Sequence, residues 1–431
     1  MNRRVRYVLG TSVAVALTVG PAVDAGAAAG TFGSTTTRVS VKSNEAQVFS
    51  PSSLSAMSLD GNFVAFVSSA QNLVTGDTNG QPDVFLRNRV AGTTSRVSVG
   101  SGGNQANGPS DLPSISRDGR YVAFFSMATN LVSGDTNGRS DIFVRDVVAG
   151  STRRVSVASS GGQANGDSAF PSISDNGQQI AFSSAASNLV SGDGNGLQDI
   201  FVRDLAAGTT RRVSVSSAGA GGNGPSSTPA ISGNGDVVAF VSDATNLAPG
   251  DTNGSPDVFA RVRSTNTTQL VSVGAGGVPA DSLSADPVLS RDGRYVAFDS
   301  SATNLVPGDT NGFQDIFVRD RLAGTTQLVS AWPSGTAANR LSTAPDISEN
   351  GQIVVFVSQL SDAGALTNVY RRNLGTGITK LASVGLSGQP ANSNSFAASV
   401  SPDGQHVGFT STATNLVAGD TNNQQDVFIR D

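Results

Sequence analysis

The strongest constraint on this chain is a sequence unit that returns every 58 residues. The string GDTNGRSDIFVRD, which begins at Gly134, recurs with small changes at several other places. The first aspartates of these strings are Asp77, Asp135, Asp193, Asp251, Asp309 and Asp420, and the first five lie 58 residues apart. A degenerate copy, SDAGALTNVYRRN, stands between the last two of them. A fixed period of this length indicates a repeat architecture, here with seven copies.

Each copy contains four segments with the residue pattern of β-strands. In the second copy these are 113–116, 121–126, 141–146 and 153–157, which are rich in β-branched and aromatic residues. Glycine, aspartate and asparagine mark the breaks between them. Four antiparallel strands per copy, repeated seven times, predict an all-β, seven-bladed β-propeller. The third strands are expected near 83–88, 141–146, 199–204, 257–262, 315–320, 368–373 and 426–431.

The two ends of the repeat region predict how the ring closes. The last copy stops after its third strand, and residues 35–41 match the fourth strands of the other copies. Pairing 35–41 with 426–431 would complete the seventh blade and leave no open sheet edge. Residues 30–431 are therefore expected to form a single propeller domain.

Residues 1–29 have the pattern of a secretory signal peptide. Three arginines precede an apolar stretch over 7–23, and the small residues of 25–29 suit cleavage. An uncleaved anchor is the alternative, but Gly20 and Pro21 interrupt a stretch that is short for a membrane span. Cleavage removes three arginines and one aspartate, which takes the formal net charge from −5 to −7 and leaves no membrane span. Since there is no cysteine to carry a lipid, we expect a secreted or periplasmic protein.

Composition excludes several classes of function. The chain has no cysteine and one histidine, His406, which excludes thiol nucleophiles and histidine-cluster zinc sites. His406 stands where other copies have Tyr121 or Tyr295, so we expect it to have a packing role. The acidic balance and the lack of a basic stripe argue against nucleic-acid binding.

The GDTNG string has the most chemical content of any motif in the chain. Its carboxylates and amides could coordinate calcium, which prefers several hard oxygens from a tightly turned loop. The candidate ligands are Asp77, Asn79, Asp83, Asp135, Asn137, Asp141, Asp193, Asn195, Asp199, Asp251, Asn253, Asp257, Asp309, Asn311, Asp315, Asp420, Asn422 and Asp426. The pattern resembles the D-x-N-x-D-G-x-x-D calcium loops of other propellers, but it is shorter and lacks the middle carboxylate. The alternative is that these side chains only hold the turn by bonding their own backbone.

The long connections should all lie on one face of the propeller. Second-to-third and fourth-to-first connections leave an antiparallel blade at the same edge, and both are long, whereas the turns at the other edge are minimal. One position in the fourth-to-first connections recurs as Asn107, Asn165, Asn223, Asp281, Asn339 and Asn392. These side chains could contact a polar ligand near the channel mouth, or they could be turn residues only.

The element S-x-D-G-x-x-[VI]-A-F followed by D-[IV]-F-[VL]-R-D resembles the TolB-like, WD-repeat-like propeller of bacterial envelopes. The similarity covers nearly all of the mature chain, and it implies the propeller fold. The separate N-terminal α/β domain of TolB is missing, and the GDTNG insertion is not part of the minimal blade. The role of TolB in its transport complex is therefore not carried over.

These patterns favour a non-catalytic binding or scaffold protein. A rigid ring of long loops suits a protein or glycan ligand of the cell envelope or exterior, because little ordering is needed on binding. A closed propeller needs no second copy, so a monomer is expected.

The alternative is a carbohydrate-active glycosidase or lyase, with or without calcium, that uses carboxylates of the long-loop face. Asp111, Asp281 and Asp286 are the candidates, and the sequence does not pick out a pair among them. Two acidic side chains that converge at the channel mouth would favour the enzyme. An uninterrupted rim of serine, asparagine and glycine would favour binding.

Overall fold

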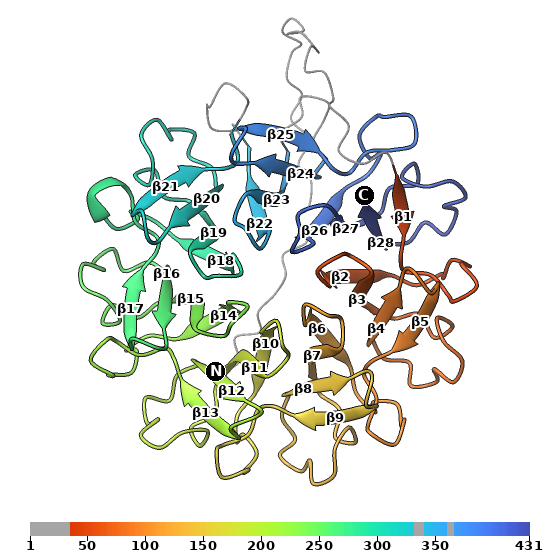
Figure 1. Ribbon diagram of the computed structural model, residues 1–431, viewed down its shortest axis with the longest axis horizontal. Helices are drawn as coiled ribbons and strands as arrows, with labels where there is room; N and C mark the ends of the chain where they lie inside the picture. Colours follow the sequence, from red (N-terminus) through yellow and green to blue (C-terminus); the bar gives the residue numbers. More distant parts are fainter. Residues whose placement is uncertain (1–34, 332–339, 360–365) are drawn as a thin grey trace, which may run out of the picture. The chain divides into compact units, whose positions relative to one another are not determined.

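Each sequence repeat folds into one four-stranded antiparallel sheet, and a computed structural model arranges seven such sheets around a central axis (Figure 1). The structure describes residues 35–331, 340–359 and 366–431, so the predicted signal peptide at 1–29 lies outside it. In six sheets the strands follow one another in chain order from the innermost to the outermost, and in the seventh the N-terminal strand β1 (Thr36–Arg38) takes the outermost place. The prediction of an all-β, seven-bladed propeller is confirmed.

Blades are numbered here in chain order, and their strands have nearly constant lengths. The first strands are β2 (Ser52–Met57), β6 (Ser110–Ile115), β10 (Ser168–Ile173), β14 (Ser226–Ile231), β18 (Ser284–Leu289), β22 (Ser342–Ile347) and β26 (Ser395–Val400). The second strands are β3 (Phe63–Ser68), β7 (Tyr121–Ser126), β11 (Gln179–Ser184), β15 (Val237–Ser242), β19 (Tyr295–Ser300), β23 (Ile353–Ser358) and β27 (Val407–Ser411).

The third strands are β4 (Asp83–Asn88), β8 (Asp141–Asp146), β12 (Asp199–Asp204), β16 (Asp257–Val262), β20 (Asp315–Asp320), β24 (Asn368–Asn373) and β28 (Asp426–Arg430). The outermost strands are β5 (Thr93–Arg96), β9 (Ser151–Arg154), β13 (Thr209–Arg212), β17 (Thr267–Leu270), β21 (Thr325–Leu328), β25 (Ile378–Leu381) and β1 (Thr36–Arg38). One 3-10 turn, η1 (Ala275–Gly277), precedes blade 5.

The seventh blade is completed by the N-terminal strand. β1 lies beside β28 (Figure 1), with Thr36 opposite Arg430 and Arg38 opposite Phe428. The backbone N–H of Val39 continues the contact by donating to the carbonyl oxygen of Val427 at 2.8 Å. The predicted closing strand is confirmed, although the regular part is shorter than 35–41 because the chain turns away after Val39.

An aromatic pair forms the centre of each blade. In blade 1, Phe66 of β3 lies opposite Phe85 of β4, and their ring centroids are 5.8 Å apart. Blade 6 has Phe356 and Tyr370 in the same places, 5.9 Å apart. The hydrophobic clusters mix residues of neighbouring blades, as where Phe124 of blade 2 packs with Ala65 of blade 1. Large apolar side chains between the sheets thus hold the ring together.

Candidate functional site

The first strands line the central channel, and most of them carry a β-bulge at the same place. The register of β6 against β7, for example, shifts between Asp111 and Ser114. In six blades the bulge residue has a left-handed backbone, with φ between 44° and 54°: Leu112, Phe170, Thr228, Asp286, Ala344 and Ala397. This conformation costs a non-glycine residue roughly 1–2 kcal/mol. Repeated strain of this kind is a common feature of functional sites.

The bulges surround a hollow of about 340 Å³ in the channel. Its wall is largely apolar, and the residues that line it include Leu112, Phe170, Thr228, Asp286 and the prolines Pro113, Pro171, Pro229, Pro287 and Pro345. The bulge residues stand two positions after the start of each first strand, close to the end of the fourth-to-first connection. The hollow therefore lies toward the long-loop face of the propeller.

Blade 5 brings two carboxylates close together, and one of them lines this hollow. Asp286 is the bulge residue of β18, and Asp299 stands on β19 opposite Ala285. The Asp286 side chain is open to the channel, whereas Asp299 is 1% exposed and its Oδ1 has no hydrogen-bond partner among the described residues. Burial and the nearby charge of Asp286 raise the pKa of Asp299 to about 7, despite hydrogen bonding from Gln314 and the Ala344 backbone. Desolvation also raises the pKa of Asp286.

The other six blades have no carboxylate at either position. The residues equivalent to Asp299 are Val67, Phe125, Ser183, Val241, Val357 and Thr410, and those equivalent to Asp286 are Leu54, Leu112, Phe170, Thr228, Ala344 and Ala397. Blades with such different residues at these positions adopt the same strands, so the fold does not require acidic groups there. The pair is the best candidate for a feature retained for function.

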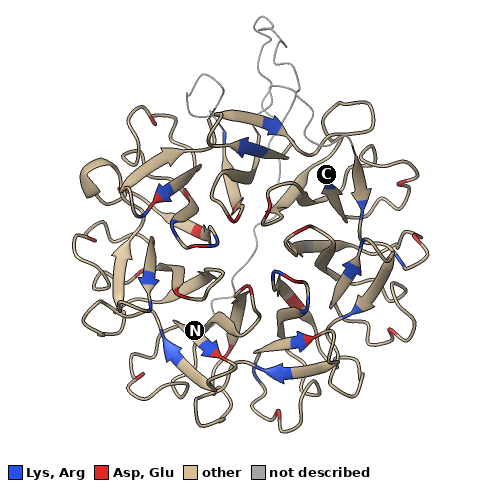
Figure 2. Cartoon of the chain, in the orientation of Figure 1, with Lys and Arg blue, Asp and Glu red and all other residues tan. Residues whose placement is uncertain are grey.

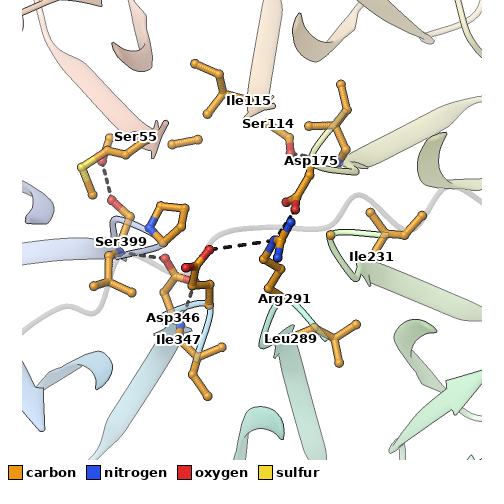
Figure 3. Close-up of a pocket in the computed structure, with 17 residues that line it drawn as sticks. Ser55, Ser114, Ile115, Asp175, Ile231, Leu289, Arg291, Asp346, Ile347 and Ser399 are labelled. Atoms are coloured by element: carbon orange, nitrogen blue, oxygen red, sulfur yellow. Dashed lines mark hydrogen bonds and ion pairs between the residues drawn. The ribbon is translucent and has the colours of Figure 1, made fainter. Parts of the chain in front are cut away.

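A third carboxylate lies further along the channel and has a structural explanation. Asp346 of β22 accepts hydrogen bonds from the backbone N–H groups of Ile347 at 2.9 Å and of Val400 in the next blade at 2.8 Å (Figure 3). Ser114 accepts the N–H of Ile173 in the same way at 3.1 Å. Burial raises the pKa of Asp346 to about 6. These side chains tie neighbouring first strands to one another.

The far end of the channel is crossed by ion pairs. The tight turns after the first strands form a ring of backbone hydrogen bonds, such as that from the N–H of Arg117 to the carbonyl of Asp175 at 3.2 Å. Arg291 lies between acidic side chains in Figure 3, at 2.5 Å from Asp175 and 3.9 Å from Glu349. Glu349 is also 3.1 Å from Arg117. The two arginines and the two acidic side chains named here therefore balance one another in charge.

The side chains of the predicted amide ring form hydrogen bonds with other residues of the protein. The Asn107 side chain accepts the N–H of Thr129 at 2.8 Å and donates to the Thr129 hydroxyl at 2.9 Å. Asn165, Asn223 and Asn392 make equivalent contacts, and the Asp281 carboxylate accepts both groups of Thr303. Asn339 lies outside the described residues. These contacts clamp the two long connections together, and a role in ligand binding stays a prediction.

The amides of the GDTNG loops hold their own turns. Asn137 donates to Asp141 Oδ2 at 2.9 Å and accepts the N–H of Arg139 at 3.0 Å. In four of these loops an arginine from the outermost strand lies between the two carboxylates: Arg38, Arg96, Arg154 and Arg212. A calcium ion in these four loops would have to displace a guanidinium group.

The three carboxylates that the sequence singled out thus have different surroundings in the structure. Asp286 lies at the hollow, Asp281 belongs to the clamp, and Asp111 bonds the N–H of Leu112 at 2.7 Å. Sequence reasoning missed Asp299, which departs from the apolar or hydroxyl residues of its sister positions. His406 pairs with Asp431 at 2.7 Å at the edge of blade 7, away from the hollow.

Two further observations concern the distribution of basic residues and the search for a membrane-spanning helix. Lysine and arginine are spread singly over the blades rather than gathered in a stripe (Figure 2). Among the residues that the structure describes, no helix has the length and apolar character needed to cross a membrane.

Comparison with known proteins shows the fold alone. No family model and no curated protein matches the sequence. An oligogalacturonate lyase in complex with manganese aligns with a TM-score of 0.56 at 13% identity, covering 93% of this chain and 94% of that chain. The β-propeller domain of the Trilobed protease from Pyrococcus furiosus aligns with a TM-score of 0.55 at 11% identity, covering 89% and 96%.

TolB from Acinetobacter baumannii aligns with a TM-score of 0.42 at 15% identity over 77% of this chain. The chain spans about 62% of the length of that protein. The protein is therefore a seven-bladed β-propeller whose fold is similar to the propellers of other proteins at low sequence identity.

Proposed function

We propose that the protein is a non-catalytic binding protein that takes a segment of a protein ligand at the hollow on its long-loop face. The observation that carries this proposal is the ring of strained bulges around an apolar hollow whose charge comes from Asp286, backed by Asp299. With the predicted signal peptide, the partner would be a protein of the cell envelope or exterior. The binding unit would be a single chain.

The chemistry of the hollow favours a particular kind of side chain. Prolines, Leu112 and Phe170 suit an apolar stem, and the carboxylate of Asp286, with the buried Asp299 close behind it, suits a cationic tip. Lysine and arginine combine these two features in one side chain. A glycan would need many polar partners, and the wall of the hollow provides few of them. A basic side chain of a protein ligand is therefore favoured over a sugar.

Selection from a random peptide library should test this. We expect the selected peptides to contain an arginine or lysine, and replacing that residue by glutamine to weaken binding. Asp286→Ala, which introduces the residue of blades 6 and 7, should reduce the affinity about 10- to 100-fold, because it removes the exposed partner of a partly desolvated charge pair. Fluorescence anisotropy with the labelled peptide measures the Kd.

Asp281→Asn is the matched control, since it introduces the residue of the sister blades at the clamp. It should leave the Kd unchanged. Selected peptides without a basic residue, or an affinity that Asp286→Ala does not alter, would count against this function.

A carbohydrate-active enzyme is the second candidate, and the carboxylate pair is the observation that favours it. Two acidic groups with different environments can divide the roles of acid and base. However, Asp299 is 1% exposed, which leaves it little access to a sugar. We expect no cleavage when the protein is incubated with oligogalacturonides and manganese, the substrate class and metal named for a structural neighbour. Cleavage that Asp286→Ala abolishes would reverse this choice.

A further inference from the structure

The buried carboxylates of the GDTNG loops lie beside an arginine in some blades and beside a leucine position in others. In blade 1, Nη1 of Arg96 is 3.0 Å from Asp77, 3.4 Å from Asp83 and 2.9 Å from Gln105. Blade 2 repeats this geometry, with Arg154 2.9 Å from Asp135 and 3.4 Å from Asp141. A cationic group therefore occupies the space between the two aspartates in these blades.

Blades 4 and 5 keep the aspartates but lack the arginine. Leu270 and Leu328 take its place at the end of the outermost strand, in the same register opposite the aromatic residue of the third strand. The aspartates remain buried: Asp251 is 7% exposed, Asp257 0%, Asp309 4% and Asp315 0%. Replacing the arginine by leucine has thus removed the positive charge and left both negative groups in place.

Blade 6 lacks both the arginine and the aspartate of the third strand. Leu381 stands in the place of the arginine, and Asn368 replaces the buried aspartate of the third strand. Asn368 accepts the hydrogen bond of Ser383 at 2.9 Å, as the aspartate does in other blades. A neutral residue therefore serves the structure equally well when no cation is present. The third-strand aspartates of blades 4 and 5, Asp257 and Asp315, therefore need another explanation.

The carboxylate oxygens of blade 4 can accept further interactions. Asp257 accepts hydrogen bonds from Ser272 at 2.6 Å and Asn253 at 2.8 Å, but Oδ1 of Asp251 is buried and has no hydrogen-bond partner within the described part of the chain. Buried carboxylates without a positive partner are costly, and a bound cation would remove that cost.

We propose that the GDTNG loops of blades 4 and 5 each bind one calcium ion in the position that a guanidinium group holds in blades 1, 2, 3 and 7. The ligands in blade 4 are Asp251, Asp257 and the carbonyl of Gly250, whose counterpart Gly76 accepts a hydrogen bond from Arg96 at 3.3 Å. In blade 5 they are Asp309, Asp315 and the carbonyl of Gly308. Hard oxygen ligands of this kind select calcium.

The expected affinity is low. No group of three or more histidine, aspartate or glutamate side chains that could hold a metal occurs in the described part of the chain, so each loop offers two carboxylates. Pro279 stands where blade 1 has Gln105, and water must complete the coordination in blade 4. Affinities of about 10⁻⁴–10⁻³ M are typical of extracellular calcium modules. This inference is independent of the hollow and of its ligand.

Counting bound calcium tests the proposal directly. Isothermal titration of the full chain with calcium should give two ions per chain, and calcium at tenfold excess over Kd should raise the Tm by a few degrees relative to EDTA. Leu270→Arg and Leu328→Arg introduce the residue of the sister blades. Each should remove one ion, and the double variant should bind none while its Tm in EDTA stays equal to or above that of the parent.

Arg96→Leu provides the reverse test. It recreates the blade 4 arrangement in blade 1, so the number of bound ions should rise from two to three. No calcium bound by the parent chain, or two ions still bound by the double arginine variant, would overturn the proposal. The count on the parent chain decides the matter even where Arg96→Leu does not fold.

Discussion

A chain that begins at Lys42, and therefore lacks β1, should be much less stable than one that begins at Thr35. The truncation removes Val39 and Val41, which are 2% and 3% exposed, and burial of each such side chain contributes about 1.5–3 kcal/mol. It also removes Arg38, which lies 3.0 Å from Asp420 and 3.2 Å from Asp426. Leaving a buried charge without its partner costs about 3–5 kcal/mol. We expect the Tm to fall by about 10 °C or more.

The truncated chain should also associate, because β28 becomes an open sheet edge. Differential scanning calorimetry and light scattering measure the two effects. A synthetic peptide of residues 35–41 should restore the Tm when added to the truncated chain, and the same peptide with Val39→Asp should not. A Tm within one or two degrees of the longer chain would mean that β1 contributes little to ring closure.

Replacing Asp299 by valine, the residue of blades 1, 4 and 6, should stabilise the protein at neutral and alkaline pH. Burial and the charge of Asp286 raise the pKa of Asp299 to about 7, against about 4 in an unfolded chain. Between these values the folded state keeps a proton that the unfolded state has released, so stability falls as the pH rises. Above pH 7 the full penalty is present, and a shift of about three pKa units corresponds to a few kcal/mol.

Urea denaturation from pH 4 to pH 8 measures this dependence. Asp299→Val should resemble the parent at pH 4 and exceed it by a few kcal/mol at pH 8, since valine has no proton to lose. Val241→Thr, at the sister position of blade 4, is the control for a change of side chain without a charge, and its effect should not depend on pH. A variant that is less stable than the parent at pH 8 would contradict the assignment of Asp299 as a destabilising group.

Such a result would bear on function as well as stability. Proteins retain destabilising groups where activity needs them, and substitutions that relieve the strain commonly reduce activity. We therefore expect Asp299→Val to weaken binding of a basic peptide while it strengthens the fold. A rise in stability together with a loss of peptide affinity would distinguish a functional carboxylate from a packing defect.

The sequence by itself determined the fold of this protein. Seven copies of one strand pattern predict seven equal sheets, and the extra segment at 35–41 predicts the closure that β1 makes with β28. These features follow from local residue patterns, because strand periodicity and turn residues act over a few neighbouring positions. Because the same pattern recurs seven times, the clear copies identify the strands of a degenerate one.

The tertiary structure decided which of the repeated and exceptional residues carry chemistry. Asp286 could be named from the sequence, but its neighbour Asp299 stands on the next strand, and only strand pairing brings the two together. The GDTNG loops look alike in sequence, yet an arginine from the outermost strand neutralises some of them, and leucine leaves others acidic. The charge state of a carboxylate depends on its burial and on the groups within a few ångströms of it. Those neighbours come from distant parts of the chain, and folding alone places them.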